Sequence, residues 1–186
     1  MSYTVGDVIK QEYPQVEDVC RFISTSILSG MAYEVTIGGE TFPQKAIIAD
    51  DNFFDFFTFP FVEGGLEDRD AVVVSQSFAN THFQEQSPIG KTIQITIGEN
   101  KKDLFIQGVY KDIKKSVFPE ADIIYGTHHI KEMYPHLIAE GNGTTVCFYR
   151  LTPGTDIEDL QDKALETLKD ADILYRLGLS KKFLLS

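Results

Sequence analysis

Apolar positions along the chain follow two different spacings. Spacings of three and four residues, typical of one helix face, predict helices at residues 5–13, 76–83, 127–138 and 155–168. Alternating or continuously apolar runs predict strands at residues 16–24, 32–37, 42–49, 71–75, 91–97, 104–110, 123–125 and 145–151. Because strands and helices alternate and some strands meet in hairpins, the pattern predicts an α+β fold with mixed sheets and βαβ-like passages at residues 71–97 and 123–151.

Turn residues separate these elements. Gly38-Gly39-Glu40 predicts a hairpin turn, because glycine adopts positive φ angles without strain. Ser87-Pro88-Ile89-Gly90 predicts a second turn. Residues 63–70 hold four acids and two glycines, and residues 99–102 are polar, so both segments are expected to be loops.

Several polar residues can begin helices. Ser75 precedes an apolar helical face and predicts an N-cap. Thr155 and Glu158 have the spacing of a capping box. Asp50 or Asp51 can cap a short helix in the segment that follows them.

That segment, residues 53–61, holds six phenylalanines and is called the Phe-rich segment below. Burying one phenylalanine contributes about 1.5–3 kcal/mol, and a single helix face cannot hold all six rings. One interpretation is a packing hub that joins two lobes. The other is a surface that faces a membrane or binds a ligand.

Net charge restricts the class of partner. The 28 acidic and 17 basic residues give a formal charge of −11, which argues against binding to nucleic acid or to anionic lipid. The N-terminus lacks the features of a signal peptide. The longest apolar run, residues 53–62, is shorter than the roughly 20 residues of a membrane span and is interrupted by polar residues and a proline.

Motifs for nucleotide binding and catalysis are weak. Gly90-Lys91-Thr92 resembles the end of a phosphate-binding loop, but Glu85 stands where that loop requires glycine. No local nucleophile motif is found. Asp50, Asp51 and Asp55 can be paired carboxylates of a hydrolase or exposed acids at a helix start.

Metal and thiol chemistry have one candidate each. His128, Glu132 and His136 are four residues apart on one expected helix face, which can hold a metal or simply face solvent. Cys20 and Cys147 lie in strand-like runs and are two buried thiols or, in an oxidising compartment, one disulfide. We assign no catalytic, cofactor-binding or metal-ligating residue from these patterns, and expect no enzyme activity.

Three stretches, in this order and spacing, resemble the extracytoplasmic core domain of MacB/FtsX-like ABC-transporter permeases. Residues 49–57 with the loop ending at Gly64-Gly65 are similar to the family's aromatic helix and following loop. Residues 71–79 with the Ser87–Thr92 turn are similar to its strand, helix and D-P-I-G-K turn, although Ser87 stands in place of the acid. Residues 105–112 are similar to its V-x-G-V-x-x-D strand.

The opening residues Pro14 to Phe22 also resemble the family, and residues 126–186 fit it more loosely. The resemblance implies that residues 1–186 form one MacB-like periplasmic core domain with two lobes, one of βαβ units and one more variable. It implies a membrane helix before Met1 and three after Ser186, at the periplasmic face of a bacterial cytoplasmic membrane. No cofactor is implied.

The same resemblance implies the partners and the function. The partners are a second permease copy, a cytoplasmic ATPase subunit or domain, and a periplasmic adaptor. The domain is expected to transmit ATP-driven motion to a substrate or partner outside the membrane. The alternative is a ligand-binding or sensor domain of another membrane protein, in which the Phe-rich segment lines an apolar pocket.

Overall fold

The chain folds as two units in the computed structural model, which describes residues 3–27, 32–84, 86–113, 116–135 and 145–170. The first unit contains both ends of the chain, Met1–Arg21 and His136–Ser186. The second unit is the continuous segment Phe22–Pro135 and is therefore an insertion in the sequence of the first. Strand β1 (Val16–Ser24) begins in the first unit and ends in the second.

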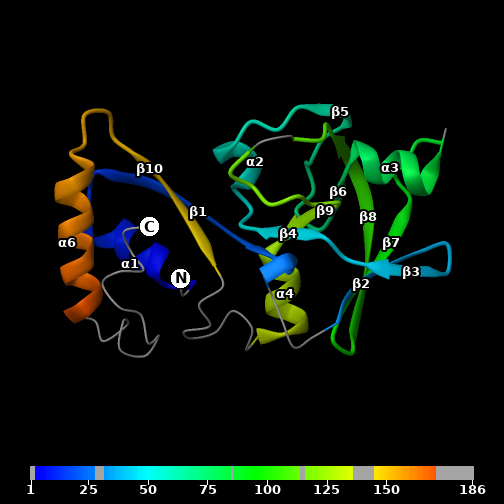
Figure 1. Cartoon of the computed structure of the whole chain (residues 1–186), viewed down its shortest axis with the longest axis horizontal. Helices are drawn as coiled ribbons and strands as arrows, with labels where there is room; N and C mark the ends of the chain where they lie inside the picture. Colours follow the sequence, from blue (N-terminus) through cyan, green and yellow to red (C-terminus); the bar gives the residue numbers. More distant parts are fainter. Residues whose placement is uncertain (1–2, 28–31, 85, 114–115, 136–144, 171–186) are drawn as a thin grey trace. The chain divides into compact units, whose positions relative to one another are not determined.

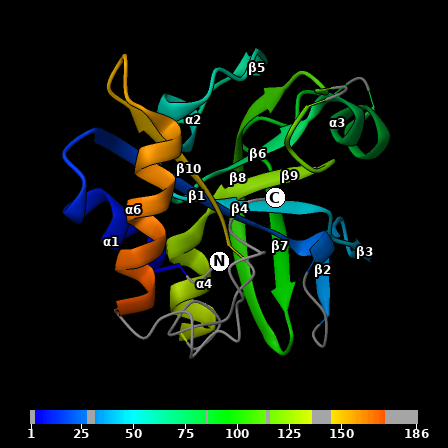
Figure 2. The ribbon, with the colours of Figure 1, turned by 60° about the vertical axis from the view of Figure 1, so that its left-hand side comes forward.

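The first unit packs two helices beside two strands (Figure 2). They are α1 (Val5–Glu12), α6 (Ile157–Asp170), the start of β1 and β10 (Val146–Leu151). Both helices have an apolar face, and these faces meet in a core formed by Val5, Ile9, Val16, Leu160, Leu165 and Leu168. The phenol of Tyr13 lies 2.6 Å from the Thr167 hydroxyl, which links the end of α1 to α6.

The second unit is built on a curved mixed sheet in the order β1-β4-β9-β6-β8-β7-β2-β3, with β5 paired to β8 (Figure 1). The strands after β1 are β2 (Tyr33–Ile37), β3 (Glu40–Pro43), β4 (Ala46–Ala49), β5 (Phe61–Gly64), β6 (Val72–Ser75), β7 (Thr92–Ile97), β8 (Asn100–Tyr110) and β9 (Ile123–Gly126). The pairs β4–β9 and β6–β8 are parallel, and the other pairs are antiparallel. This arrangement confirms the predicted α+β class with mixed sheets.

Strand β8 connects the two halves of this sheet. Its first residues pair with β7, from Asn100 opposite Ile97 to Phe105 opposite Thr92. Its last residues pair with β6 on one side and β5 on the other. The buried side chains of the strand begin at Leu104 and include Ile106 and Val109. One long strand thus pairs with strands of both halves of the sheet.

Strand β5 approaches β8 so closely that only glycine fits at the contact. A Cβ on Gly108 would lie 2.5 Å from the carbonyl oxygen of Gly65, and one on Gly64 would lie 2.1 Å from that of Gln107. Gly64 also has a φ of +63°, a left-handed conformation that favours glycine. Two segments that carry the family resemblance therefore touch each other through their glycines.

Short helices cover the second unit. They are η1 (Thr25–Ile27), α2 (Phe53–Phe56), α3 (Gln76–Phe83) and α4 (Thr127–Met133). As predicted, the Ser75 hydroxyl caps α3 by accepting a hydrogen bond from the Phe78 amide at 3.1 Å. None of the helices in the described residues is long and apolar enough to cross a lipid bilayer.

The Phe-rich segment forms an aromatic cluster within the second unit. Phe53 is 1% exposed, and its ring centroid lies 5.1–6.3 Å from five other rings, those of Phe22, Phe54, Phe57, Phe59 and Phe118. Phe59 is also buried, whereas the other rings of the segment are half-buried. These contacts agree with a packing role for the segment. Each of them joins two residues of the second unit, so they do not show the hub between two lobes that the sequence interpretation described.

Three sequence predictions about element boundaries are wrong. The predicted strand 42–49 is two strands, β3 and β4, because Gln44 interrupts it: its amide donates to the Tyr33 carbonyl and its side chain is buried. The predicted loop 63–70 begins as β5, since the Gly64–Gly108 contact brings it into the sheet. Residues 100–102 are not a connection but the start of β8, and the turn is confined to Gly98-Glu99.

Helix caps also differ from the prediction. Helix α2 starts after Asn52, not after Asp50 or Asp51, and Asn52 makes no side-chain cap bond. At α6 the cap bond comes from Asp156, which accepts from the Asp159 amide, instead of from Thr155. In both places several neighbouring residues have suitable side chains, and the backbone geometry selects among them.

Removing the Phe53 ring is expected to destabilise the second unit strongly. Phe53→Ala leaves a cavity among five rings and should lower the free energy of unfolding by about 3–5 kcal/mol in urea denaturation. Phe56→Ala, at a half-buried position of the same helix, is the matched control and should cost clearly less. Equal losses for the two variants would contradict a core role for Phe53.

Candidate functional site

In the part of the chain that the structure describes, the start of the Phe-rich segment borders only a small space, whereas its Phe59 lines a larger cleft of about 240 Å³. Phe53 and Phe54 border a space of only about 30 Å³, together with Asp50, Asp51 and Arg69. Sites for drug-sized ligands are about 300–1,000 Å³. The rings fill the space around them because they pack edge to face against one another.

Two of the three acids considered for hydrolysis contact other polar side chains. Asp50 lies 3.4 Å from the Thr127 hydroxyl, and Asp51 lies 3.6 Å from the Arg69 guanidinium and 3.4 Å from His128. Asp55 is exposed and does not line the space that Asp50 and Asp51 border.

Glu132 and His128, two of the three residues proposed from helix spacing, have different partners in the structure. Glu132 forms a salt bridge with Lys102 of β8, and its carboxylate is 61% exposed. His136 lies outside the described residues. His128 instead belongs to a different group of side chains, which the sequence pattern does not predict.

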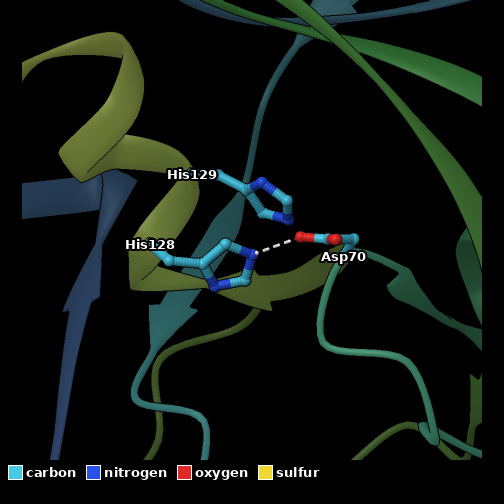
Figure 3. Close-up of side chains that lie close together, drawn as sticks. All are labelled: Asp70, His128 and His129. Carbon is cyan, nitrogen blue, oxygen red and sulfur yellow. Dashed lines mark hydrogen bonds and ion pairs between the residues drawn. The ribbon is translucent and has the colours of Figure 1, made fainter.

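This group, the His–Asp cluster, consists of Asp70, His128 and His129 (Figure 3). The two histidines begin helix α4, and Asp70 comes from the loop before β6. Nitrogen and oxygen atoms of the three side chains all lie within 4.8 Å of one another. Figure 3 shows both imidazole rings beside the Asp70 carboxylate, and His128 Nε2 lies 3.0 Å from Asp70 Oδ1.

Burial determines the protonation of His129. His129 is completely buried. Burial, with the neighbouring His128 and Lys102, lowers the pKa of His129 to about 4, so this imidazole is neutral at pH 7. The carboxylate of Asp70 is 64% exposed, whereas the His128 side chain is 11% exposed. The cluster therefore has a buried end and a solvent-facing end.

An acidic cleft of about 240 Å³ lies elsewhere in the second unit. Its polar lining includes Ser75, Ser77, Asp112, Glu120 and Asp122, and its aromatic lining Phe59, Tyr110 and Phe118. Desolvation raises the pKa of the Asp122 carboxyl. The sequence analysis missed this cleft, because its residues come from four separate segments and form no local motif.

Asp112 has a structural role in that cleft. Its two carboxylate oxygens accept hydrogen bonds from the Ser77 amide at 3.2 Å and the Ser77 hydroxyl at 2.7 Å, which fixes the first turn of α3. The partner lies 35 residues earlier in the chain, because β8 is parallel to β6 and ends beside it.

The first unit has an apolar groove of about 330 Å³. It is lined by α1, β1, β10 and α6, with Phe148, Ile157 and Leu160 among its residues. Ile157 is 56% exposed. Cys20 is buried and Cys147 is half-buried.

Comparison with known families decides the identity of the domain. The MacB-like periplasmic core domain family matches residues 1–167. The chain belongs to this family. It is thus an extracytoplasmic domain of the MacB-like ABC-transporter permease family, as the sequence resemblance predicts. This family is a transporter permease domain and not an enzyme class. No curated protein sequence matches the chain significantly.

Solved structures share the fold of this MacB-like domain. One is a domain described as that of a permease protein from Porphyromonas gingivalis, with a TM-score of 0.69 and 24% identity over 91% of this chain and 70% of that chain. Another is the periplasmic region of MacB from Actinobacillus actinomycetemcomitans, with a TM-score of 0.66 and 14% identity over 92% and 74%. The extracellular domain of the noncanonic ABC-type transporter YknZ from Gram-positive bacteria gives 0.64 and 14% over 89% and 82%.

The raised pKa of Asp122 predicts a pH-dependent effect in this MacB-like domain. The folded state holds the Asp122 proton more tightly than the unfolded state, so ionisation of Asp122 reduces stability as pH rises through the folded-state pKa. Asp122→Asn removes this loss. Its free energy of unfolding should therefore rise relative to wild type between pH 3.5 and pH 7.

Urea denaturation at several pH values measures this difference. Asp162→Asn in helix α6 is the control, because Asp162 is exposed and belongs to the other unit. A difference between Asp122→Asn and wild type that stays constant across the pH range would contradict the burial argument.

Proposed function

We propose that this domain transmits ATP-driven motion of a permease to a substrate or partner outside the cytoplasmic membrane. One observation carries the proposal: both ends of the chain belong to the first unit, and the second unit is inserted between them. If membrane helices flank residues 1–186, as the family resemblance implies, their motion enters the first unit directly. It reaches the second unit through the two chain crossings next to Phe22 and Pro135.

The packing of the second unit supports its role as a rigid body. Strands β4, β6 and β9 lie in the interior of the sheet, and β4 and β6 are buried at every residue. The rings around Phe53 also pack against one another within this unit. Close-packed interiors resist compression, so a displacement at one edge moves the whole unit.

The partners follow from the same proposal. They are a second permease copy, a cytoplasmic ATPase subunit or domain that acts through the membrane helices, and a periplasmic adaptor. The expected location is the periplasmic face of a bacterial cytoplasmic membrane. The formal charge of −11 supports a domain that stays soluble beside that surface and does not adsorb to anionic lipid.

The cavities give less support to a sensor or a hydrolase. A sensor that uses the Phe-rich segment needs an apolar pocket, and the space beside Phe53 and Phe54 is about 30 Å³. A hydrolase that uses Asp50, Asp51 and Asp55 needs converging carboxylates, and Asp55 does not border the space that Asp50 and Asp51 line. The transmitter proposal needs neither feature.

Distance measurement in the full-length permease tests the proposal. Cys20 and Cys147 are replaced by serine, and one spin label is attached through Val62→Cys in the second unit, where the side chain is 50% exposed. The permease and its ATPase are reconstituted in lipid nanodiscs. Pulsed electron resonance then measures the distance between the labels of the two copies. Trapping with ATP and vanadate should shift this distance relative to the nucleotide-free state.

Two controls make the result decisive. A label at Ile157→Cys, which is 56% exposed in the first unit, reports the motion before the chain crossings. An ATPase variant that does not bind ATP should leave both distances unchanged. If ATP moves neither label while ATP is hydrolysed normally, the domain is not a transmitter.

A further inference from the structure

The His–Asp cluster has the composition of a transition-metal site. It offers two imidazoles and one carboxylate, all from side chains of the second unit. Zn²⁺ is bound by such nitrogen and oxygen ligands at about 2.0–2.2 Å, so two ligands of one tetrahedral ion lie about 3.3 Å apart. The distance of 3.0 Å between His128 Nε2 and Asp70 Oδ1 is close to this separation.

We propose that Asp70, His128 and His129 bind a divalent transition-metal ion, with Zn²⁺ the preferred ion. Imidazole ligands favour zinc and its neighbours over Mg²⁺ and Ca²⁺, which take oxygen ligands. Three protein ligands leave a fourth position for water or for a group from a partner. The ion connects the start of α4 to the loop before β6.

His129 is the observation that points to a ligand. The residue is completely buried, yet neither of its ring nitrogens has a hydrogen-bond partner in the part of the chain that the structure describes. A buried unsatisfied polar group costs about 1–3 kcal/mol. Figure 3 shows one nitrogen of this ring close to the Asp70 carboxylate. A metal ion at this point satisfies the nitrogen.

The residues around the cluster hold its rings in place. Asp51 Oδ1 lies 3.4 Å from His128 Nδ1, although without hydrogen-bond geometry. A carboxylate behind a metal-bound histidine typically orients the ring and increases its basicity. Gly126 provides the space: a Cβ there would lie 2.4 Å from the His128 ring.

The loop that carries Asp70 is also fixed. The side-chain oxygen of Gln107 accepts hydrogen bonds from the amides of Glu67 and Asp68, at 2.7 and 2.9 Å. Asp68 in turn accepts from the Asp70 amide at 2.9 Å. The carboxylate of Asp70 is thus held over α4 while most of its surface remains open to solvent, which gives an ion a path to the buried His129.

Metal titration of the intact chain, made without a polyhistidine tag and treated with EDTA, tests the proposal. Calorimetry with Zn²⁺ should give one site per chain, and Co²⁺ should produce the visible absorption bands of a low-symmetry nitrogen and oxygen site. His129→Gln and Asp70→Asn should each weaken Zn²⁺ binding at least ~10-fold. Because Asp70 is exposed, Asp70→Asn remains informative if His129→Gln fails to fold.

Two control variants locate the ion. His82→Gln changes a histidine of helix α3 that packs on Phe42 and Phe78, and it should bind Zn²⁺ like wild type. Glu132→Gln tests the helix-face site suggested by sequence spacing, and it should also retain binding. The proposal is overturned if wild type binds no Zn²⁺, if folded Asp70→Asn and His129→Gln bind as wild type does, or if only Glu132→Gln loses binding.

Discussion

The close contact between strands β5 and β8 is the constraint on which the second unit depends. A Cβ on Gly64 would collide with the Gln107 carbonyl, and one on Gly108 would collide with the Gly65 carbonyl. This contact keeps β5 on one side of β8 while β6 pairs on the other. The same stretch of β8 carries Gln107, which holds the loop leading to Asp70. The placement of β5 and of the loop that carries Asp70 therefore depends on a few residues near the end of one strand.

Much of the fold follows from local sequence patterns. Alternation in residues 92–97 and the fully apolar run 72–74 predict their strands because burial on a sheet imposes these periods. Ser75 identifies the start of α3 because an N-cap bond is local. Strand β5 could not be predicted in this way, since a four-residue segment that ends in Glu63 and Gly64 becomes a strand only through contact with Gly108, more than 40 residues later.

Site prediction fails for a related reason. A prediction from the spacing of His128, Glu132 and His136 considers one helix without its neighbours. In the structure Glu132 forms a salt bridge with Lys102 of β8, and Asp70 lies beside the histidines at the start of the helix. Adjacent histidines do not share an ideal helix face, so the pair at 128 and 129 gives no periodic signal. The family resemblance, in contrast, depends on glycine, proline and aromatic positions that make the fold, and it identifies the family without identifying a site.

The central claim is that the second unit receives force only through the first. Single-molecule pulling from the two chain ends measures this directly, because both ends belong to the first unit. The account predicts two unfolding events: a first extension from the segments at the two ends, then a longer one that corresponds to residues 22–135. A first event with the length of residues 22–135, or a single event for the whole chain, would contradict it.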